Sequence, residues 1–244
     1  MALISLEDLD GLDDERDVVE ESEASNEMER QRLLTHWQAV GRSHHVSVPT
    51  EMTGPIQEMT RNQERQEIPF TPVSHQDKLE EELYEEKVCP GGKWACVTRE
   101  EQLYEQSISN GFMKLMRFIC KENSAGCNLG MTIPIVTNIH LKEDGRSFHK
   151  DVVTAYYLPS EFQADPPQPA DPEVSIVFRP SFRVLARSFS GTTTEETVTW
   201  QINQLWEHLG PSRDFQRDNY MVAVFENPGL PRRRNEIWFI HRDP

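Results

Sequence analysis

The feature that most constrains the fold of this chain is an internal repeat with an offset of ninety residues. In two segments, apolar residues recur at positions i, i+4, i+7 and i+11, which predicts two amphipathic helices that each cover a sheet. The first stripe is Ile108, Phe112, Leu115 and Ile119, and the second is Val198, Ile202, Leu205 and Leu209. The sequence therefore predicts two similar halves.

Strand-like segments follow each predicted helix. Apolar runs begin at Met131 and at Met221, which the ninety-residue offset superimposes. A further run follows in each half, at 151–158 and at 235–240. Runs rich in apolar and β-branched residues are typical of strands. Each half is therefore predicted to fold as strand, helix, strand, strand.

The two halves need each other to bury their strand edges. A helix over three strands leaves unpaired edges, which two halves packed into one curved sheet or barrel would remove. The proline-rich segment 165–172, DPPQPADP, is predicted to be an extended connector. We predict an α+β domain at 81–244 whose strands form either one curved sheet or a barrel. It is built from two pseudo-symmetric βαββ repeats, about 81–160 and 173–242, with two flanking helices.

An acidic segment precedes this domain. Residues 1–30 hold twelve acidic side chains and two arginines, and the whole chain has a net charge of −16. Residues 1–80 are rich in Glu, Gln, Ser and Arg, a composition that buries too little apolar surface to fold alone. We predict a largely disordered acidic arm at 1–80. Its charge repels nucleic acid, so no nucleic-acid partner is expected.

One part of the arm has helical periodicity. Leu33, Trp37 and Val40 at i, i+4 and i+7 predict a short helix at 26–40. This helix is transient, packs on the domain, or docks on a partner through its apolar side. A protein partner for residues 1–45 is therefore kept as an alternative.

The sequence lacks the patterns of secreted, membrane-spanning and catalytic chains. It begins without a signal segment, and no apolar run has the roughly 18 residues that span a bilayer. We expect a soluble, cytoplasmic protein without a membrane span. The four cysteines lack zinc-site spacing and are expected to be free thiols. Since no phosphate loop, GxSxG or HExxH motif occurs, we expect no enzymatic activity.

The first predicted helix carries two further stripes beside its core stripe. The methionine stripe comprises Met113, Met116 and Cys120, and the basic stripe comprises Lys114, Arg117 and Lys121. Soft apolar side chains beside cations suit a flat apolar ligand that carries carboxylates. Alternatively, the methionines widen the buried face of the helix, and the basic side chains are only solvated.

Six segments occur in a characteristic order between Tyr84 and Arg242. They are YEEKVCPGGKWACV, GFMKLMRFI, MTIPIV, YYLPSEFQADPPQPADPEV, VLARSFSG and RRNEIWFI. Together they resemble the SOUL/heme-binding protein family, and they are most similar to its tetrapyrrole-binding heme-binding-protein branch. The resemblance implies that the domain is a distorted, antiparallel-rich β-barrel of two pseudo-symmetric βαββ repeats flanked by two helices. It also implies binding of heme or another porphyrin without a catalytic step.

The resemblance further implies a ligand cleft beside the first helix and the loop at 229–233. The implied site residues are Phe112, Met113, Met116, Arg117, Tyr220, Arg232 and Arg233. Cys89, which precedes Pro90, is the candidate metal ligand because thiolate is a recognised heme ligand. The resemblance, however, already explains this segment as a strand, a glycine-rich turn and a second strand.

We therefore expect a monomeric, non-enzymatic protein that binds heme or another tetrapyrrole reversibly, as an intracellular heme buffer or carrier. The alternative is a protein-interaction or regulatory module that acts through the N-terminal arm, with the barrel as its scaffold, because a fold does not guarantee its family's ligand.

Overall fold

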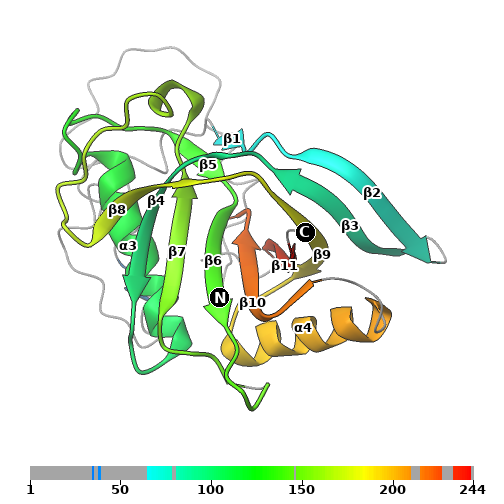
Figure 1. Cartoon of the computed structure of the whole chain (residues 1–244). Coiled ribbons are helices and arrows are strands. Elements are labelled where there is room, and N and C mark those ends of the chain that lie inside the picture. Colours follow the sequence, from blue (N-terminus) through cyan, green and yellow to red (C-terminus); the bar gives the residue numbers. More distant parts are fainter. Residues whose placement is uncertain are drawn as a thin grey trace, which may run out of the picture.

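The structure is a computed structural model. It describes residues 35, 38–39, 65–78, 81–145, 147–209, 215–226 and 233–242. Two long helices, α3 (Tyr104–Cys120) and α4 (Glu195–Leu209), pack against a large curved sheet (Figure 1). Neither helix is long and apolar enough to cross a membrane, and this holds for every helix among these residues.

The large sheet has nine strands. They are β2 (Thr71–Lys78), β3 (Glu81–Cys89), β4 (Gly92–Arg99), β6 (Ile135–His140), β7 (Val152–Tyr157), β8 (Val174–Arg179), β9 (Phe182–Ser190), β10 (Phe215–Val224) and β11 (Arg234–His241). Their order is β2-β3-β9-β11-β10-β6-β7-β4-β8, and all neighbours are antiparallel. A separate parallel pair joins β1 (Arg65–Glu67) to β5 (Met131–Ile133). A short 3-10 helix, η4 (Ser160–Phe162), follows β7.

The two predicted halves meet at the centre of the sheet. The order β9-β11-β10 on one side is mirrored by β4-β7-β6 on the other, and β10 pairs with β6. The helix α3 lies between β4 and β6 in sequence, as α4 lies between β9 and β10. Met131 lies in β5, outside this sheet, whereas Met221 lies in β10. The ninety-residue offset therefore matches the helices but misaligns the strands that follow them.

Two long bent strands give the sheet its curvature. The chain bends between β3 and β4 and again between β8 and β9, yet the register continues across both bends. Val88 lies opposite Arg183 before the bend, and Lys93 lies opposite Phe178 after it. At the bend Gly92 lies against Tyr157, and a Cβ atom there would come within 2.6 Å of the tyrosine ring. The glycine-rich turn in YEEKVCPGGKWACV thus permits close packing of the bent strands.

Two expectations about the architecture need correction. Among the described strands β2 and β8 lie at the ends of the sheet and do not pair with each other, so hydrogen bonding does not close the predicted barrel. The sheet also includes β2, which lies in the segment assigned to the disordered arm of 1–80. The predicted short helix at 26–40 lies outside the described residues, apart from Thr35, Gln38 and Ala39, which are helical.

Three apolar clusters make up the core. The α3 cluster contains Leu115, Met116, Phe118 and Ile119 of the helix, together with Ala95, Val97, Tyr156 and Val174 of the sheet. The α4 cluster contains Val198, Ile202 and Leu205, together with Tyr220, Ile237 and Phe239. The inner cluster, on the opposite face of the sheet, contains Ile68, Cys89, Trp94, Tyr157 and Trp238. Alternate strand residues therefore point to opposite faces, as a sheet covered on both sides requires.

Candidate functional site

The helix α3 lies very close to the sheet. Gly111 faces Thr154 of β7, and a Cβ atom on this glycine would come within 2.7 Å of the threonine Oγ1. The missing side chain therefore allows a close approach between helix and strand. None of the residues of α3 is exposed, although several polar ones are only half-buried. Any ligand on this helix would meet its half-buried outer residues.

The methionine stripe divides between the core and the outer side of α3. Met116 has 1% of its surface exposed and lies inside the α3 cluster, and Cys120 is equally buried. Phe112 and Met113 are only partly buried and pack against the margin of this cluster. The alternative that methionines widen the buried face thus describes Met116, whereas Phe112 and Met113 remain accessible in part.

The basic stripe is engaged by the chain's own carboxylates. Lys114 Nζ lies 2.6 Å from Asp171 Oδ2 and 2.7 Å from Glu173 Oε2. Arg117 Nε donates to Glu122 Oε1 at 3.0 Å. Lys121, the residue after α3, is exposed. The cations predicted to bind ligand carboxylates are present, but two of them already hold acidic side chains.

The ion pairs around Lys114 shift the pKa values of both partners. Burial alone would lower the pKa of Lys114, but hydrogen bonds to Asp171 and Glu173 outweigh it and raise this pKa. Burial alone would raise the pKa of Asp171, but hydrogen bonds from Lys114 and from the Glu173 amide outweigh it and lower this pKa. The charged form of each partner is therefore favoured.

A further arginine extends this network along the outer side of the helix. Arg99 Nη1 donates to Glu173 at 2.8 Å and its Nη2 donates to Glu101 at 2.6 Å. Asn110 of α3 donates to the same Glu101 carboxylate at 3.0 Å. The network fixes the end of the proline-rich connector on α3. The network is not evident from the sequence, because Lys114 and Asp171 are 57 positions apart and no periodicity links them.

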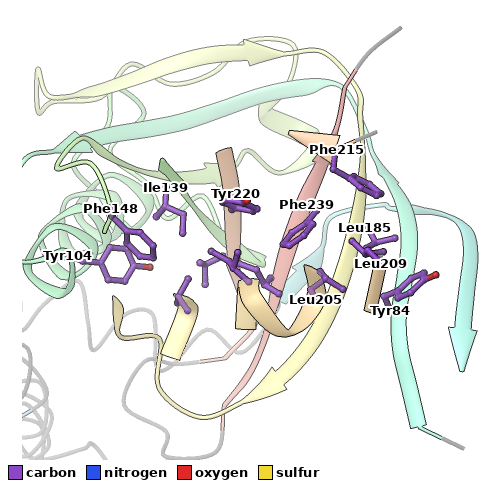
Figure 2. Packing of buried hydrophobic residues seen from close by; sticks show 14 of the residues in the cluster. Tyr84, Tyr104, Ile139, Phe148, Leu185, Leu205, Leu209, Phe215, Tyr220 and Phe239 are labelled. Carbon is purple, nitrogen blue, oxygen red and sulfur yellow. The ribbon is translucent and has the colours of Figure 1, made fainter. Parts of the chain in front are cut away.

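Tyr220 lies in the α4 cluster rather than beside the methionines. Its hydroxyl donates to the Arg217 carbonyl at 2.7 Å and accepts from Trp206 Nε1 at 3.0 Å. Figure 2 shows its ring near Phe239, with a centroid separation of 4.9 Å. Burial raises the pKa of Tyr220. The structure therefore gives this tyrosine a packing role at the centre of a cluster.

Of the two implied arginines in the loop before β11, Arg232 and Arg233, only Arg233 belongs to the described residues. It has 3% of its surface exposed, and its Nη2 donates to Thr193 Oγ1 at 3.1 Å. Burial lowers its pKa. Arg232 and the preceding loop lie outside the described residues. Arg233 thus joins the segment before α4, and it also interacts electrostatically with Tyr104 at the start of α3.

Cys89 is fully buried in the inner cluster, on the face of the sheet opposite α3. Burial raises the pKa of its thiol to about 12. A thiolate ligand needs the deprotonated form. The structure therefore places the candidate metal ligand on the opposite face of the sheet from Phe112 and Met113, and burial disfavours its thiolate form.

A known family matches most of the chain. The family model described as SOUL heme-binding protein matches residues 65–240. The chain belongs to the SOUL heme-binding protein family. The match begins at β1, so the SOUL domain of this chain includes the two strands that sequence analysis placed in the arm.

Relatives of this SOUL domain share about a third of its residues. Heme-binding protein 1 from Mus musculus is 32% identical over 163 residues, which cover 66% of this chain and 85% of that protein. Heme-binding protein 2 from Homo sapiens is 29% identical over 154 residues, which cover 62% of this chain and 74% of that protein.

Solved structures give a weaker similarity. The C-terminal domain of EcmrR has a TM-score of 0.42 at 10% identity, over 70% of this chain and 100% of that one. A similarity of this size carries no argument about function.

Proposed function

We propose that this SOUL-family protein binds heme or another tetrapyrrole reversibly on the outer side of α3. The observation that carries the proposal is the family match over 65–240. Relatives at about 30% identity are named heme-binding proteins. Phe112 and Met113 would contact the macrocycle, and Arg117 and Lys121 would pair with its carboxylates. This assignment uses the part of the predicted site that remains accessible.

The side chains on the outer side of α3 have the chemical properties that a tetrapyrrole needs. Phe112 and Met113 are apolar and partly buried, which suits contact with a flat ring. Arg117 exposes 33% of its side chain and Lys121 is exposed, so a ligand can reach both from solvent. Bound heme would supply a redox-active iron whose properties depend on its axial ligand.

The free energy gained from apolar contact with the ring should exceed the cost of breaking an existing ion pair. Exposed ion pairs contribute roughly 0.2–1 kcal/mol each, so displacing one carboxylate costs little. Apolar contact contributes roughly 25 cal/mol per Å², so covering about 100 Å² yields about 2.5 kcal/mol. The ring would therefore provide most of the affinity, and the cations would orient its carboxylates.

The physiological role that we propose is a buffer or carrier in the cytoplasm, without a chemical step. A carrier must release its ligand as well as bind it. Transfer of heme from the loaded protein to apomyoglobin tests this directly. Complete transfer within minutes supports a carrier, and heme that stays bound under excess acceptor contradicts reversible binding.

The primary test is a hemin titration of the full chain, followed by Soret absorbance. Met113→Glu should weaken binding at least tenfold, because it places a carboxylate against the ring and beside the propionates. The matched control is Trp200→Glu, which introduces the same charge at a side chain of α4 that is 54% exposed. Equal affinity of the Met113 variant and the wild type would contradict the α3 site, and non-saturating binding by the wild type would contradict tetrapyrrole binding itself.

A further inference from the structure

The outer side of α3 is electrically balanced before any ligand arrives. Four cations lie on or beside this side of the helix, together with four carboxylates that pair with three of them. The cations are Arg99, Lys114, Arg117 and Lys121, and the carboxylates are Glu101, Glu122, Asp171 and Glu173. This set, the α3 ion-pair network, offers an anionic ligand little net positive charge.

The cations of the network differ in how strongly they are held. Lys114 bridges two carboxylates at 2.6 and 2.7 Å, one of which also accepts from Arg99 at 2.8 Å. Arg117 holds the single carboxylate of Glu122 at 3.0 Å. A first ligand carboxylate can pair with Arg117 at the cost of one ion pair, and Lys121 is exposed one turn further on.

Each additional ligand carboxylate meets a less favourable environment. Beyond Arg117 and Lys121 it must separate Lys114 from Asp171 and Glu173, or stay unpaired beside them. Like charges a few ångströms apart repel, and at a partly buried surface this repulsion is only partly screened by salt. The cost therefore increases with the number of carboxylates on the ligand.

We propose that the α3 ion-pair network selects tetrapyrroles by their number of carboxylates. The site accepts macrocycles with two carboxylates, such as heme and protoporphyrin, and discriminates against those with four or eight. Asp171 and Glu173 are the specificity-determining residues, because they occupy the cation that a third carboxylate would need. This inference rests on the proposed tetrapyrrole binding at α3.

The test compares three porphyrins that differ in carboxylate number. Protoporphyrin IX carries two, coproporphyrin III four and uroporphyrin III eight, and quenching of porphyrin fluorescence follows each titration of the full chain. At moderate ionic strength we expect coproporphyrin to bind about tenfold more weakly than protoporphyrin, as the loss of one to two ion pairs predicts. Uroporphyrin should bind more weakly still.

Variants connect this selectivity to the network. Asp171→Asn combined with Glu173→Gln frees Lys114 and should reduce the preference for protoporphyrin to about twofold to threefold. The matched control is Asp165→Asn combined with Glu161→Gln, which makes the same two kinds of substitution at exposed positions of the segment between β7 and β8. The control should keep the wild-type preference.

The outcomes separate this inference from the proposed function. If none of the three porphyrins binds, tetrapyrrole binding itself fails. If all three bind with equal affinity, the protein binds tetrapyrroles but the selectivity is overturned. If both double variants change the preference equally, total charge rather than Asp171 and Glu173 determines it, and the assignment of these residues is overturned.

Discussion

Lys87 of β3 and Glu236 of β11 form an ion pair of 2.7 Å across β9, with 5% and 2% of their side chains exposed. The same Glu236 oxygen accepts from Trp238 Nε1 at 2.7 Å. The Lys87 ammonium also lies 4.9 Å from the centroid of the Phe70 ring and 5.5 Å from that of Trp238. A buried charge is tolerated only when it is paired and hydrogen-bonded, and this pair meets that requirement while joining β3, β11 and the segment before β2.

The buried pair predicts a large effect of removing one partner. Lys87→Met leaves the Glu236 carboxylate buried with less compensation and should lower the free energy of unfolding by about 3–5 kcal/mol. Lys87→Met combined with Glu236→Gln removes both charges and should recover part of this loss. Urea denaturation measures both, with Lys142→Met at an exposed position as the control. A loss below about 1 kcal/mol for the single variant would mean that the pair contributes little.

The buried thiols predict a simple pattern of reactivity. Cys89, Cys96 and Cys120 are buried, and Cys127 is exposed. Burial raises the pKa of Cys89 to about 12, so its nucleophilic thiolate is nearly absent at neutral pH. In the folded protein one thiol should react rapidly with Ellman's reagent, and Cys127→Ser should abolish this fast phase.

The same burial predicts how heme should respond to changes at Cys89. Cys89→Ser should leave the Soret band of the hemin complex unchanged, because Cys89 lies in the inner cluster and the sheet separates this cluster from α3. A shifted Soret maximum in Cys89→Ser would instead support thiolate ligation.

The parts of the fold that follow from local periodicity were predictable from the sequence. The second stripe is buried in the α4 cluster, and Leu115 and Ile119 of the first stripe are buried in the α3 cluster, because a spacing of 3.6 residues per turn fixes which side chains share a face. Phe112 packs only at the margin of the α3 cluster, and Ile108 packs against the α4 cluster. The strands after the helices were misaligned, since Met131 belongs to β5 and the counterpart of β10 is β6. Strand pairing depends on contacts between distant segments, which a repeat offset in sequence does not encode.

The types of residue at the site were predictable from the sequence, but the ion pairs that these residues form were not. Phe112, Met113 and Arg117 lie on the predicted helix, at its outer side or margin. Spacing alone could not show that Met116 is buried and Met113 only partly buried, because the apolar face of a half-buried helix varies in width. Asp171 joins Lys114 only because the connector returns to α3, which is a tertiary contact.

The carboxylates of the network predict how stability depends on pH. Hydrogen bonding from Lys114 lowers the pKa of Glu173. Burial alone would raise the pKa of Asp171, but its hydrogen bonds outweigh burial and lower this pKa. A lowered folded-state pKa gives stability that is present above the unfolded value and lost as the pH falls through the folded one.

The difference in unfolding free energy between the wild type and Asp171→Asn should therefore be constant above about pH 5 and shrink below about pH 4. Thermal or urea denaturation across the range from about pH 7 to about pH 3 measures this difference. Asp165→Asn, in the same connector but exposed, is the control. A difference that stays constant over the whole range would show that the Asp171 carboxylate does not stabilise the folded state.

The two methionines of α3 predict opposite phenotypes. Met116 is 1% exposed and packed in the α3 cluster, so Met116→Ala creates a cavity and should cost about 2–5 kcal/mol of unfolding free energy. Met113→Ala, at the margin of the cluster, should cost about 1 kcal/mol or less by the same argument but weaken hemin binding several-fold.

Met116→Leu keeps the side-chain volume and should retain both stability and hemin affinity. Denaturation and Soret titration of the three variants give both quantities. If Met116→Leu lost hemin affinity at full stability, Met116 would contact the ligand directly, and the heme surface would extend into what the structure shows as core.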